Sequence, residues 1–277
     1  MLIAESDLPP SLVDRLELDA VEVLAPGRLG NQLFRVWDKA EGPAYLKIGT
    51  GIAGQDQIDE AERLDWIGHY LPVPRVLHYA TQGDRVFVLT TELPGTPSHE
   101  CIEIISAPTV VAKLAEGLKM VHEVPTEDCP FDRVLENELK ESARRIDSLG
   151  LNVEAFTADT GAAPSRVLEH LVAQASQISD SVFTHGDYCF PNLLLDRQCI
   201  SGIVDWGIAG ISDRHRDFMS VELTIKRNCG EKWIPTFYEL YGECDVDPER
   251  IRFFWLLDRF FSHYECPTGS EPLGGSP

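Results

Sequence analysis

The stretch THGDYCFPNLLLDRQCISGIVDWG, residues 184–207, sets two carboxylates and an amide among short apolar runs. Asp187 follows the run SVF and the dipeptide His185-Gly186, Asn192 lies five residues later, and Asp205 follows the run SGIV. A carboxylate beside buried strands is costly unless it is paired, hydrogen-bonded or bound to a metal ion. The stretch therefore indicates that these three side chains have specific partners or a chemical task.

The spacing of the three residues suits phosphoryl transfer. One carboxylate can orient a hydroxyl and accept its proton, while an amide and a second carboxylate hold Mg²⁺ on the nucleotide phosphates. Protein kinases have the same D-x-x-x-x-N spacing followed by D-x-G, here Asp187 to Asn192 and then Asp205-Trp206-Gly207. Each residue alone is read equally well as a turn residue or a strand-end cap. All three in this order favour the catalytic interpretation.

An upstream lysine adds to this pattern. Lys47 ends the apolar run AYLK and lies thirteen residues before Glu60, which falls on a predicted helix. In kinases a strand lysine reaches the α- and β-phosphates and is held by a helix glutamate. Alone, the pair is better read as solvated charge, and Glu62 on the same helix is a competing partner. The loop PGRLGNQ, residues 26–32, could cover the phosphates, but it is not G-x-G-x-x-G.

The order of the predicted elements indicates an α+β protein with two lobes. Strand-like runs lie in residues 20–36 and 44–48, a helical pattern covers 55–71, and residues 73–93 predict a hairpin. PGTPS, residues 94–98, predicts a hinge. Helical patterns follow over residues 107–124, 130–150, 163–178, 217–230, 232–242 and 248–261, with LNVEAFTADTGAA as a polar loop. We predict a nucleotide-binding lobe (1–93), a catalytic and substrate-binding lobe (94–261) and a disordered tail (262–277).

Composition narrows the class of protein. A chain of 277 residues that is 43% hydrophobic can bury an ample core. Its net charge of -21 argues against binding to nucleic-acid phosphates and favours a cationic ligand or simply solubility. The seven cysteines are scattered singly, so neither a zinc site nor a disulfide framework is predicted. Without a signal peptide or an apolar run of membrane-spanning length, we expect a cytoplasmic protein that does not enter membranes.

The sequence resembles the aminoglycoside phosphotransferases, and more narrowly the 3'-phosphotransferases that modify kanamycin-type antibiotics. The THGD…N…D pattern is shared by many small-molecule kinases, whereas ERLDW…LPVP, RNCGE and LLDRFF are more specific to the 3'-enzymes. The matching pieces are collinear over about residues 20–261: AYLKI, DEAERLDWIGHYLPVPRVLHY, LTTELPG, FTHGDYCFPNLLLD, SGIVDWG, SDRHRDF, RNCGEKW and RIRFFWLLDRFF.

The resemblance implies a two-lobed, protein-kinase-like fold. A small antiparallel-sheet N-lobe with one helix would precede a larger, mainly helical C-lobe, and the enzyme would use ATP or GTP with Mg²⁺. Asp187 would be the catalytic base, and Asn192 and Asp205 the magnesium ligands. The DEAERLDW register selects Glu60 as the partner of Lys47.

Other binding positions are also implied by the resemblance. Each charge-assisted contact to an ammonium group is worth about 1.5–3 kcal/mol, which suits a cationic aminoglycoside as the partner. For Asp159, solvated helix-face charge is an equally good interpretation. Tyr45 would stack on the purine, and the backbone of Thr91 and Leu93 would hold its edge. The implied substrate-binding carboxylates are Glu154, Asp159, Glu231 and Asp258.

Three departures from the family concern the substrate range. Arg259 stands where the family usually has an acidic residue, and Ile208 stands where an arginine commonly follows D-x-G. The chain also continues past Phe261, where the family typically ends in a carboxylate that helps bind the drug. Two further hypotheses stay open: a kinase of another small hydroxylated cationic or sugar-like metabolite or antibiotic, and a non-catalytic nucleotide-binding protein. Both nucleotides, and both a monomer and a dimer, are compatible with the sequence.

Overall fold

The structure is a computed structural model that describes residues 3, 5–24, 31–147, 150–178, 180–242 and 246–263. Backbone contacts divide these residues into two compact units. The first unit comprises the described residues up to Gly95 together with Ser201–Gly207, and the second comprises Thr96–Ile200 and the described residues from Ile208 on. Most of the predicted loop at residues 26–32 lies outside the described residues.

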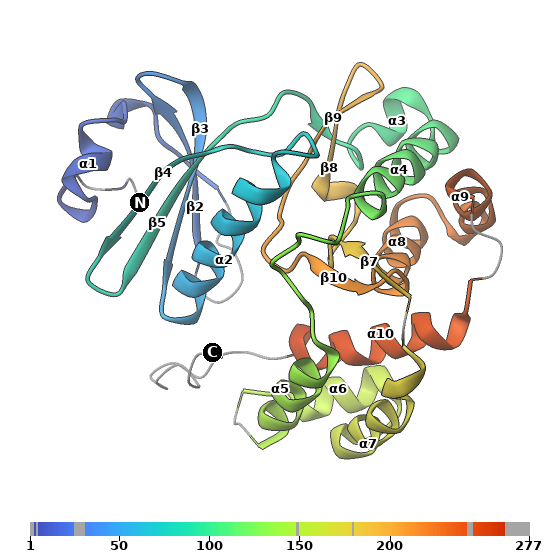
Figure 1. The fold of residues 1–277 in the computed structure, drawn as a ribbon. Coiled ribbons are helices and arrows are strands. Elements are labelled where there is room, and N and C mark those ends of the chain that lie inside the picture. Colours follow the sequence, from blue (N-terminus) through green and yellow to red (C-terminus); the bar gives the residue numbers. More distant parts are fainter. Residues whose placement is uncertain are drawn as a thin grey trace. The chain divides into compact units, whose positions relative to one another are not determined.

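A five-stranded antiparallel sheet forms the first unit (Figure 1). Its strand order is β1-β2-β3-β5-β4, so that β3 lies at the centre and carries Lys47. In β3 and β5, Leu46 is the partner of Leu89 and Lys47 is the partner of Val88. The strands are β1 (Glu22–Val23), β2 (Gln32–Asp38), β3 (Gly42–Thr50), β4 (Val76–Gln82) and β5 (Arg85–Thr91).

One face of this sheet is buried under the N-terminal segment. Alternate strand residues such as Leu46 and Leu89 belong to one hydrophobic core with Leu8 and Leu12. The segment holds the short helix α1 (Pro10–Val13), which was not predicted and whose Leu12 is fully buried. Two 3-10 turns flank it, η1 (Glu5–Asp7) and η2 (Leu18–Ala20).

The opposite face carries the helix α2 (Ile52–Ile67). This helix packs closely on the sheet at Gly54, where a Cβ would lie 3.0 Å from Val86 Cγ2. The helix ends before Pro72, as the sequence predicts. Since Glu60 lies on α2, this helix sets the position of the predicted lysine partner.

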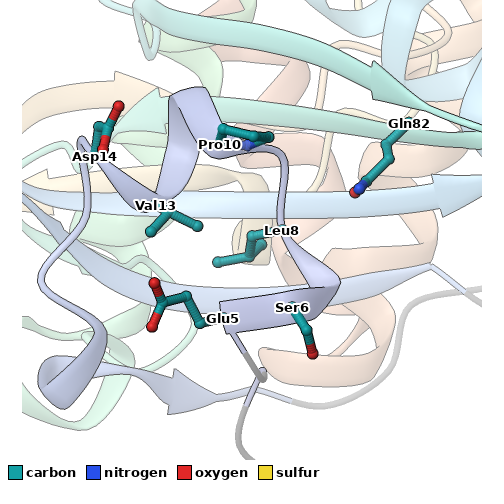
Figure 2. A pocket seen from close by; sticks show the side chains of 7 residues that line it. All are labelled: Glu5, Ser6, Leu8, Pro10, Val13, Asp14 and Gln82. Atoms are coloured by element: carbon teal, nitrogen blue, oxygen red, sulfur yellow. The ribbon is translucent and has the colours of Figure 1, made fainter.

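A hollow in the first unit lies beside η1 and α1 (Figure 2). A second, apolar groove runs along α5 and α7 in the second unit. Neither includes a predicted site residue. The hollow in Figure 2 is lined by Glu5, Ser6, Leu8, Pro10, Val13, Asp14 and Gln82.

Helices dominate the second unit (Figure 1). One core cluster of this unit includes Phe156, Leu171, Phe253, Leu257 and Phe260. No helix among the described residues is both long and apolar enough to cross a bilayer. The helices are α3 (Ile102–Ile105), α4 (Ala107–His122), α5 (Leu135–Asp147), α6 (Val153–Thr160), α7 (Pro164–Gln174), α8 (His215–Asn228), α9 (Ile234–Tyr241) and α10 (Pro248–Ser262), with 3-10 turns η4 (Ala175–Gln177), η5 (Phe190–Asn192) and η6 (Glu231–Trp233).

Short strands carry the opening stretch of the sequence analysis. They are β6 (Thr96–Pro97), β7 (Ser181–Thr184), β8 (Leu193–Asp196), β9 (Cys199–Ile203) and β10 (Gly210–Asp213). β7 pairs with β10, and the other three follow the order β6-β8-β9. At the β8–β9 turn Arg197 and Gln198 both have positive φ, as a type I′ hairpin requires. The sheet unit and the helical unit confirm the predicted α+β fold.

Two boundaries differ from those predicted. The prediction of a polar loop for LNVEAFTADTGAA is wrong, because residues Val153–Thr160 form the helix α6. The Asn152 side chain caps its start, Gly161 ends it with φ of 75°, and Phe156 is fully buried against Phe260. The two capped ends and the buried phenylalanine stabilise this helix although its sequence contains few apolar residues. The predicted tail begins at residue 262, yet that residue still ends α10, and residues 264–277 lie outside the described part of the chain.

Candidate active site

Lys47 and Glu60 form an ion pair within the first unit. Successive side chains of a strand point to opposite faces, so Lys47 lies on the face away from the buried Leu46 and Ile48. On that face Lys47 Nζ donates to Glu60 Oε2 at 2.5 Å. Glu60 is buried, whereas the competing Glu62 is exposed. The structure thus pairs the two residues that the family register selects, and their contact with phosphate stays a prediction.

Carboxylates keep Lys47 charged. Burial alone would lower the pKa of Lys47, but the attraction of Glu60 and then of Asp205 outweighs it and raises the pKa above its ordinary value. A lysine with a raised pKa is cationic throughout the neutral range. The first unit therefore holds a fixed positive charge that suits phosphate oxygens.

The segment Ser201–Gly207 packs within the first unit although its neighbours in sequence belong to the second. Ile203 N donates to Pro72 O at 2.9 Å. Gly202 packs against Leu93, because a Cβ there would lie 2.3 Å from Leu93 Cδ1 and would displace that side chain. These contacts fix the backbone that leads to Asp205.

Asp205 has an unusual backbone conformation. Its φ is 69°, in the left-handed region that few residues other than glycine adopt, although aspartate is enriched there. The next residue, Trp206, is fully buried and donates Nε1 to Ile203 O at 2.8 Å. Asp205 itself is exposed. Because such strained positions cluster at functional sites, this conformation supports a role for its carboxylate.

Tyr45, predicted to stack on the purine, lies two residues before Lys47 and therefore on the same face of β3. Its Cα partner on β2 is Arg35, whose Nε donates to both carboxylate oxygens of Glu92 at 3.1 and 2.9 Å. Sequence reasoning did not single out this ion pair. No sequence pattern indicates it, because Glu92 follows β5 and Arg35 lies on β2, two strands away in the sheet.

The two backbone positions predicted to hold the purine edge follow β5. Thr91 N donates to Arg75 O at 3.0 Å, so this N–H is not available to a purine. The predicted contact of Thr91 with the purine edge would therefore be made by its carbonyl oxygen. Leu93 is half-buried, and its side chain packs against Gly202. Both residues belong to the same unit as Lys47.

The second unit contains the loop of Asp187. Gly186 has φ of 89°, and a Cβ there would lie 2.8 Å from Ile208 O, so only glycine fits. Asp187 is exposed at this turn. Asn192 is buried on η5 and donates Nδ2 to Asp187 O at 2.9 Å. Because a carbonyl only accepts, this bond fixes the amide orientation and makes Oδ1 the potential metal ligand of Asn192.

The buried carboxylate of Asp217 hydrogen-bonds the backbone of the Asp187 loop. Asp217 on α8 accepts from His185 N at 2.8 Å and from Gly186 N at 2.7 Å. It also bonds His122 Nε2 at 3.0 Å, and His122 Nδ1 bonds the hydroxyl of Tyr241 at 2.8 Å. Burial alone would raise the pKa of Asp217, but the hydrogen bonds from His122 and from the loop outweigh it and lower the pKa. Asp217 is thus a positioning residue that the sequence reasoning missed, although it lies in the motif SDRHRDF.

Changing Asp217 to asparagine should misplace the loop of Asp187. The amide has one acceptor oxygen in place of the carboxylate's two, so one of the two loop amides loses its partner. We expect kcat to fall about 10²-fold, the loss that a misplacement of about 1 Å can cause, with little change in the KM for nucleotide. Steady-state kinetics would show this. A fall in kcat matched by an equal fall in the folded fraction, measured by urea unfolding, would instead indicate a general loss of folding.

The four predicted substrate-binding carboxylates lie on three elements of the second unit. Glu154 and Asp159 are exposed on α6, Glu231 is exposed on η6, and Asp258 is half-exposed on α10. Arg259 brings Asp159 and Asp258 together by bonding both. No ion pair among the described residues joins Glu154 or Glu231 to them.

One other group in the second unit has the spacing of a metal site. The described residues Asp180, Asp213 and His215 bring potential ligand atoms within 4.8 Å of one another. However, Asp180 pairs with Arg214 at 2.5 Å and Asp213 pairs with Arg250 at 3.2 Å. These ion pairs neutralise the carboxylates, so the group needs no metal ion.

Comparisons with known proteins identify the family and the fold. Residues 22–254 match the family described as "Phosphotransferase enzyme family". An aminoglycoside 3'-phosphotransferase of Niallia circulans is 31% identical over 91% of this chain and 97% of that protein. A streptomycin 3''-kinase of Streptomyces griseus is 29% identical over 84% of this chain and 89% of that protein. The structure of an aminoglycoside-3'-phosphotransferase of type VIII has a TM-score of 0.75 at 28% identity, covering 87% of this chain and 94% of that chain.

The fold, the paired lysine and the supported aspartate loop, taken with these matches, define an O-phosphotransferase, an enzyme that transfers a phosphoryl group to a hydroxyl. The chain belongs to the phosphotransferase enzyme family and, within it, to the aminoglycoside phosphotransferases. This membership confirms the resemblance seen in the sequence. It also argues against the hypothesis that the chain is a non-catalytic nucleotide-binding protein.

Proposed function

We propose that this enzyme transfers the γ-phosphoryl group of ATP or GTP to the 3'-hydroxyl of an aminoglycoside and so confers resistance. The observation that carries the proposal is the supported loop in which Asp187 is exposed and Asn192 is held against its backbone. The names of the relatives at about 30% identity support the acceptor position. A structure of a Streptomyces rimosus relative with ADP and streptomycin, at 25% identity and a TM-score of 0.72, supports a nucleotide and an aminoglycoside as the two substrates.

Each predicted residue has a task in this reaction. Asp187 would orient the acceptor hydroxyl and accept its proton as the new bond to phosphorus forms. Lys47, held by Glu60, would bind the α- and β-phosphates. Tyr45 and the backbone of Thr91 and Leu93 would bind the purine.

The side chains predicted to hold magnesium fit that ion. Asn192 offers an amide oxygen and Asp205 a carboxylate, and Mg²⁺ prefers oxygen ligands. When bound, the ion would neutralise the charge that builds on the phosphate oxygens. The carboxylates predicted to bind the ammonium groups are Glu154, Asp159, Glu231 and Asp258.

The acceptor position can be tested with two closely related antibiotics. Kanamycin carries a 3'-hydroxyl and tobramycin lacks it, so the purified enzyme with MgATP should add one phosphoryl group to kanamycin and none to tobramycin. Mass spectrometry of both products gives the answer directly. Equal phosphorylation of tobramycin would contradict the 3' assignment, and GTP in place of ATP would reveal the nucleotide preference.

Streptomycin is the second candidate substrate. The observation that favours it is the relative named streptomycin 3''-kinase, which is 29% identical over most of this chain. The same mass spectrometry with streptomycin would decide between the candidates. Modification of streptomycin alone would replace the 3' proposal with this one.

A further inference from the structure

Arg259 bridges two carboxylates that belong to the predicted substrate site. Its Nη1 donates to Asp159 Oδ2 at 2.9 Å, and its Nη2 donates to Asp258 Oδ2 at 2.6 Å. His263 Nε2 lies 3.1 Å from the same oxygen of Asp159. Both aspartates therefore already have a cation as partner before any substrate arrives.

The guanidinium of Arg259 is held firmly in this position. Its side chain is only 13% exposed, and its central carbon lies 5.1 Å from the centre of the Trp255 ring, within range of a cation–π contact. The two aspartates are much more open, at 37% and 39% exposed. A planar guanidinium that already lies on a tryptophan ring loses little additional conformational entropy when it binds two carboxylates.

Charge counting shows the consequence for a cationic ligand. Asp159 and Asp258 alone would offer two negative charges to an ammonium group, but Arg259 cancels one of them and occupies oxygens of both. An incoming ammonium group would have to displace the guanidinium. An uncharged hydroxyl would meet no such competition.

We propose that Arg259 is a specificity-determining residue that fills, with its own cation, the position at which Asp159 and Asp258 would otherwise hold an ammonium group of the substrate. The enzyme then selects aminoglycosides that present an uncharged group there. This inference rests on the proposed function and names the residue that narrows its substrate range.

Changing Arg259 to methionine tests the proposal. Methionine keeps an unbranched stem beside Trp255 and removes the charge and all donors. We expect the KM for kanamycin to fall about tenfold while kcat changes little, because the guanidinium no longer competes for Asp258 and Asp159, although His263 still contacts Asp159. The gain should shrink as salt screens the exposed charges. Arg144→Met is the matched control, since Arg144 is an exposed arginine of the same unit that pairs with Glu141 on its own helix.

A double-mutant cycle separates this role from a structural one. Asp159→Asn should raise the KM for kanamycin more in the Arg259→Met background than in the wild type, because there the guanidinium no longer competes with substrate for that carboxylate. A purely structural bridge between α6 and α10 would give the opposite sign: Asp159→Asn would raise KM less in the Arg259→Met background than in the wild type, because the bridge is already broken there. If Arg259→Met unfolds, Arg259→Lys takes its place, because lysine keeps the charge without the planar fork. Its KM for kanamycin should lie below that of the wild type but should fall by less than the tenfold expected for Arg259→Met.

The outcomes distinguish this inference from the proposed function. Turnover of kanamycin with the same KM in wild type, Arg259→Met and Arg144→Met would overturn the role of Arg259 and leave the function intact. Absence of turnover with every aminoglycoside would overturn the function. In that case, calorimetric titration of kanamycin still decides the role of Arg259, and equal affinities for Arg259→Met and Arg144→Met would overturn it.

Discussion

Replacing Asp187 by asparagine should lower kcat by about 10²–10⁴-fold, the range over which a positioned general base contributes to a reaction. The amide keeps the size and the loop position of the side chain but cannot accept the proton of the acceptor hydroxyl. The loop itself should persist, because Asp217 holds the backbone amides of His185 and Gly186 rather than the side chain of Asp187. Stopped-time mass spectrometry of kanamycin with MgATP would measure the loss.

Nucleotide binding separates this effect from unfolding. The predicted nucleotide contacts, among them Lys47, belong to the first unit, so the Asp187→Asn variant should bind ATP with near-normal affinity in a calorimetric titration. Asp128→Asn makes the same chemical change at an exposed residue of the second unit and should keep full turnover. Near-normal turnover by Asp187→Asn would exclude Asp187 as the base.

Replacing Glu138 by alanine should have the largest effect on stability. Glu138 on α5 accepts from Arg133 and Arg216, and the side chains of Glu138 and Arg216 are each only 10% exposed. Arg216 also lies over the ring of Phe254, at 4.9 Å. Removing the glutamate leaves a buried guanidinium without its partner, which typically costs about 3–5 kcal/mol of unfolding free energy. Urea unfolding of the two proteins would measure the difference.

The pH dependence of stability should show that the charge of Glu138 causes this stabilisation. Burial alone would raise the pKa of Glu138, but Arg216 and Arg133 outweigh it and hold the pKa below the ordinary value of 4.5. A lowered pKa in the folded state means that the stabilisation is complete above pH 4.5 and is lost as the pH falls through the lower, folded-state value. The difference between wild type and Glu138→Ala should narrow over that range.

A neighbour on the same helix provides the control for Glu138. Glu136 pairs with Lys140 one turn later on the surface of α5, so Glu136→Ala should change the unfolding free energy little. A loss from Glu138→Ala no larger than that from Glu136→Ala would show that the buried ion pairs do not stabilise the second unit.

The sequence by itself determined the fold class and the family, and it predicts the residues of the transfer chemistry. Strand and helix periods, turn residues and the D-x-x-x-x-N and D-x-G spacings are local, so they can be read without neighbours in space. They missed α6, because its one buried aromatic, Phe156, is buried by the distant Phe260. They also missed Asp217, because nothing local shows that an aspartate at the start of a helix lies beneath another loop.

Only the tertiary structure decided which charges meet. It paired Lys47 with Glu60, packed the segment of Asp205 within the first unit and placed Asp217 under the loop of Asp187. It also joined Asp159 and Asp258 through Arg259, which the sequence shows only as a cation among acidic positions. The physical reason is that an ion pair depends on the distance between side chains that the chain separates by as many as a hundred residues. Residue types and spacing therefore predict the reaction, and packing determines which carboxylates already have a cation as partner.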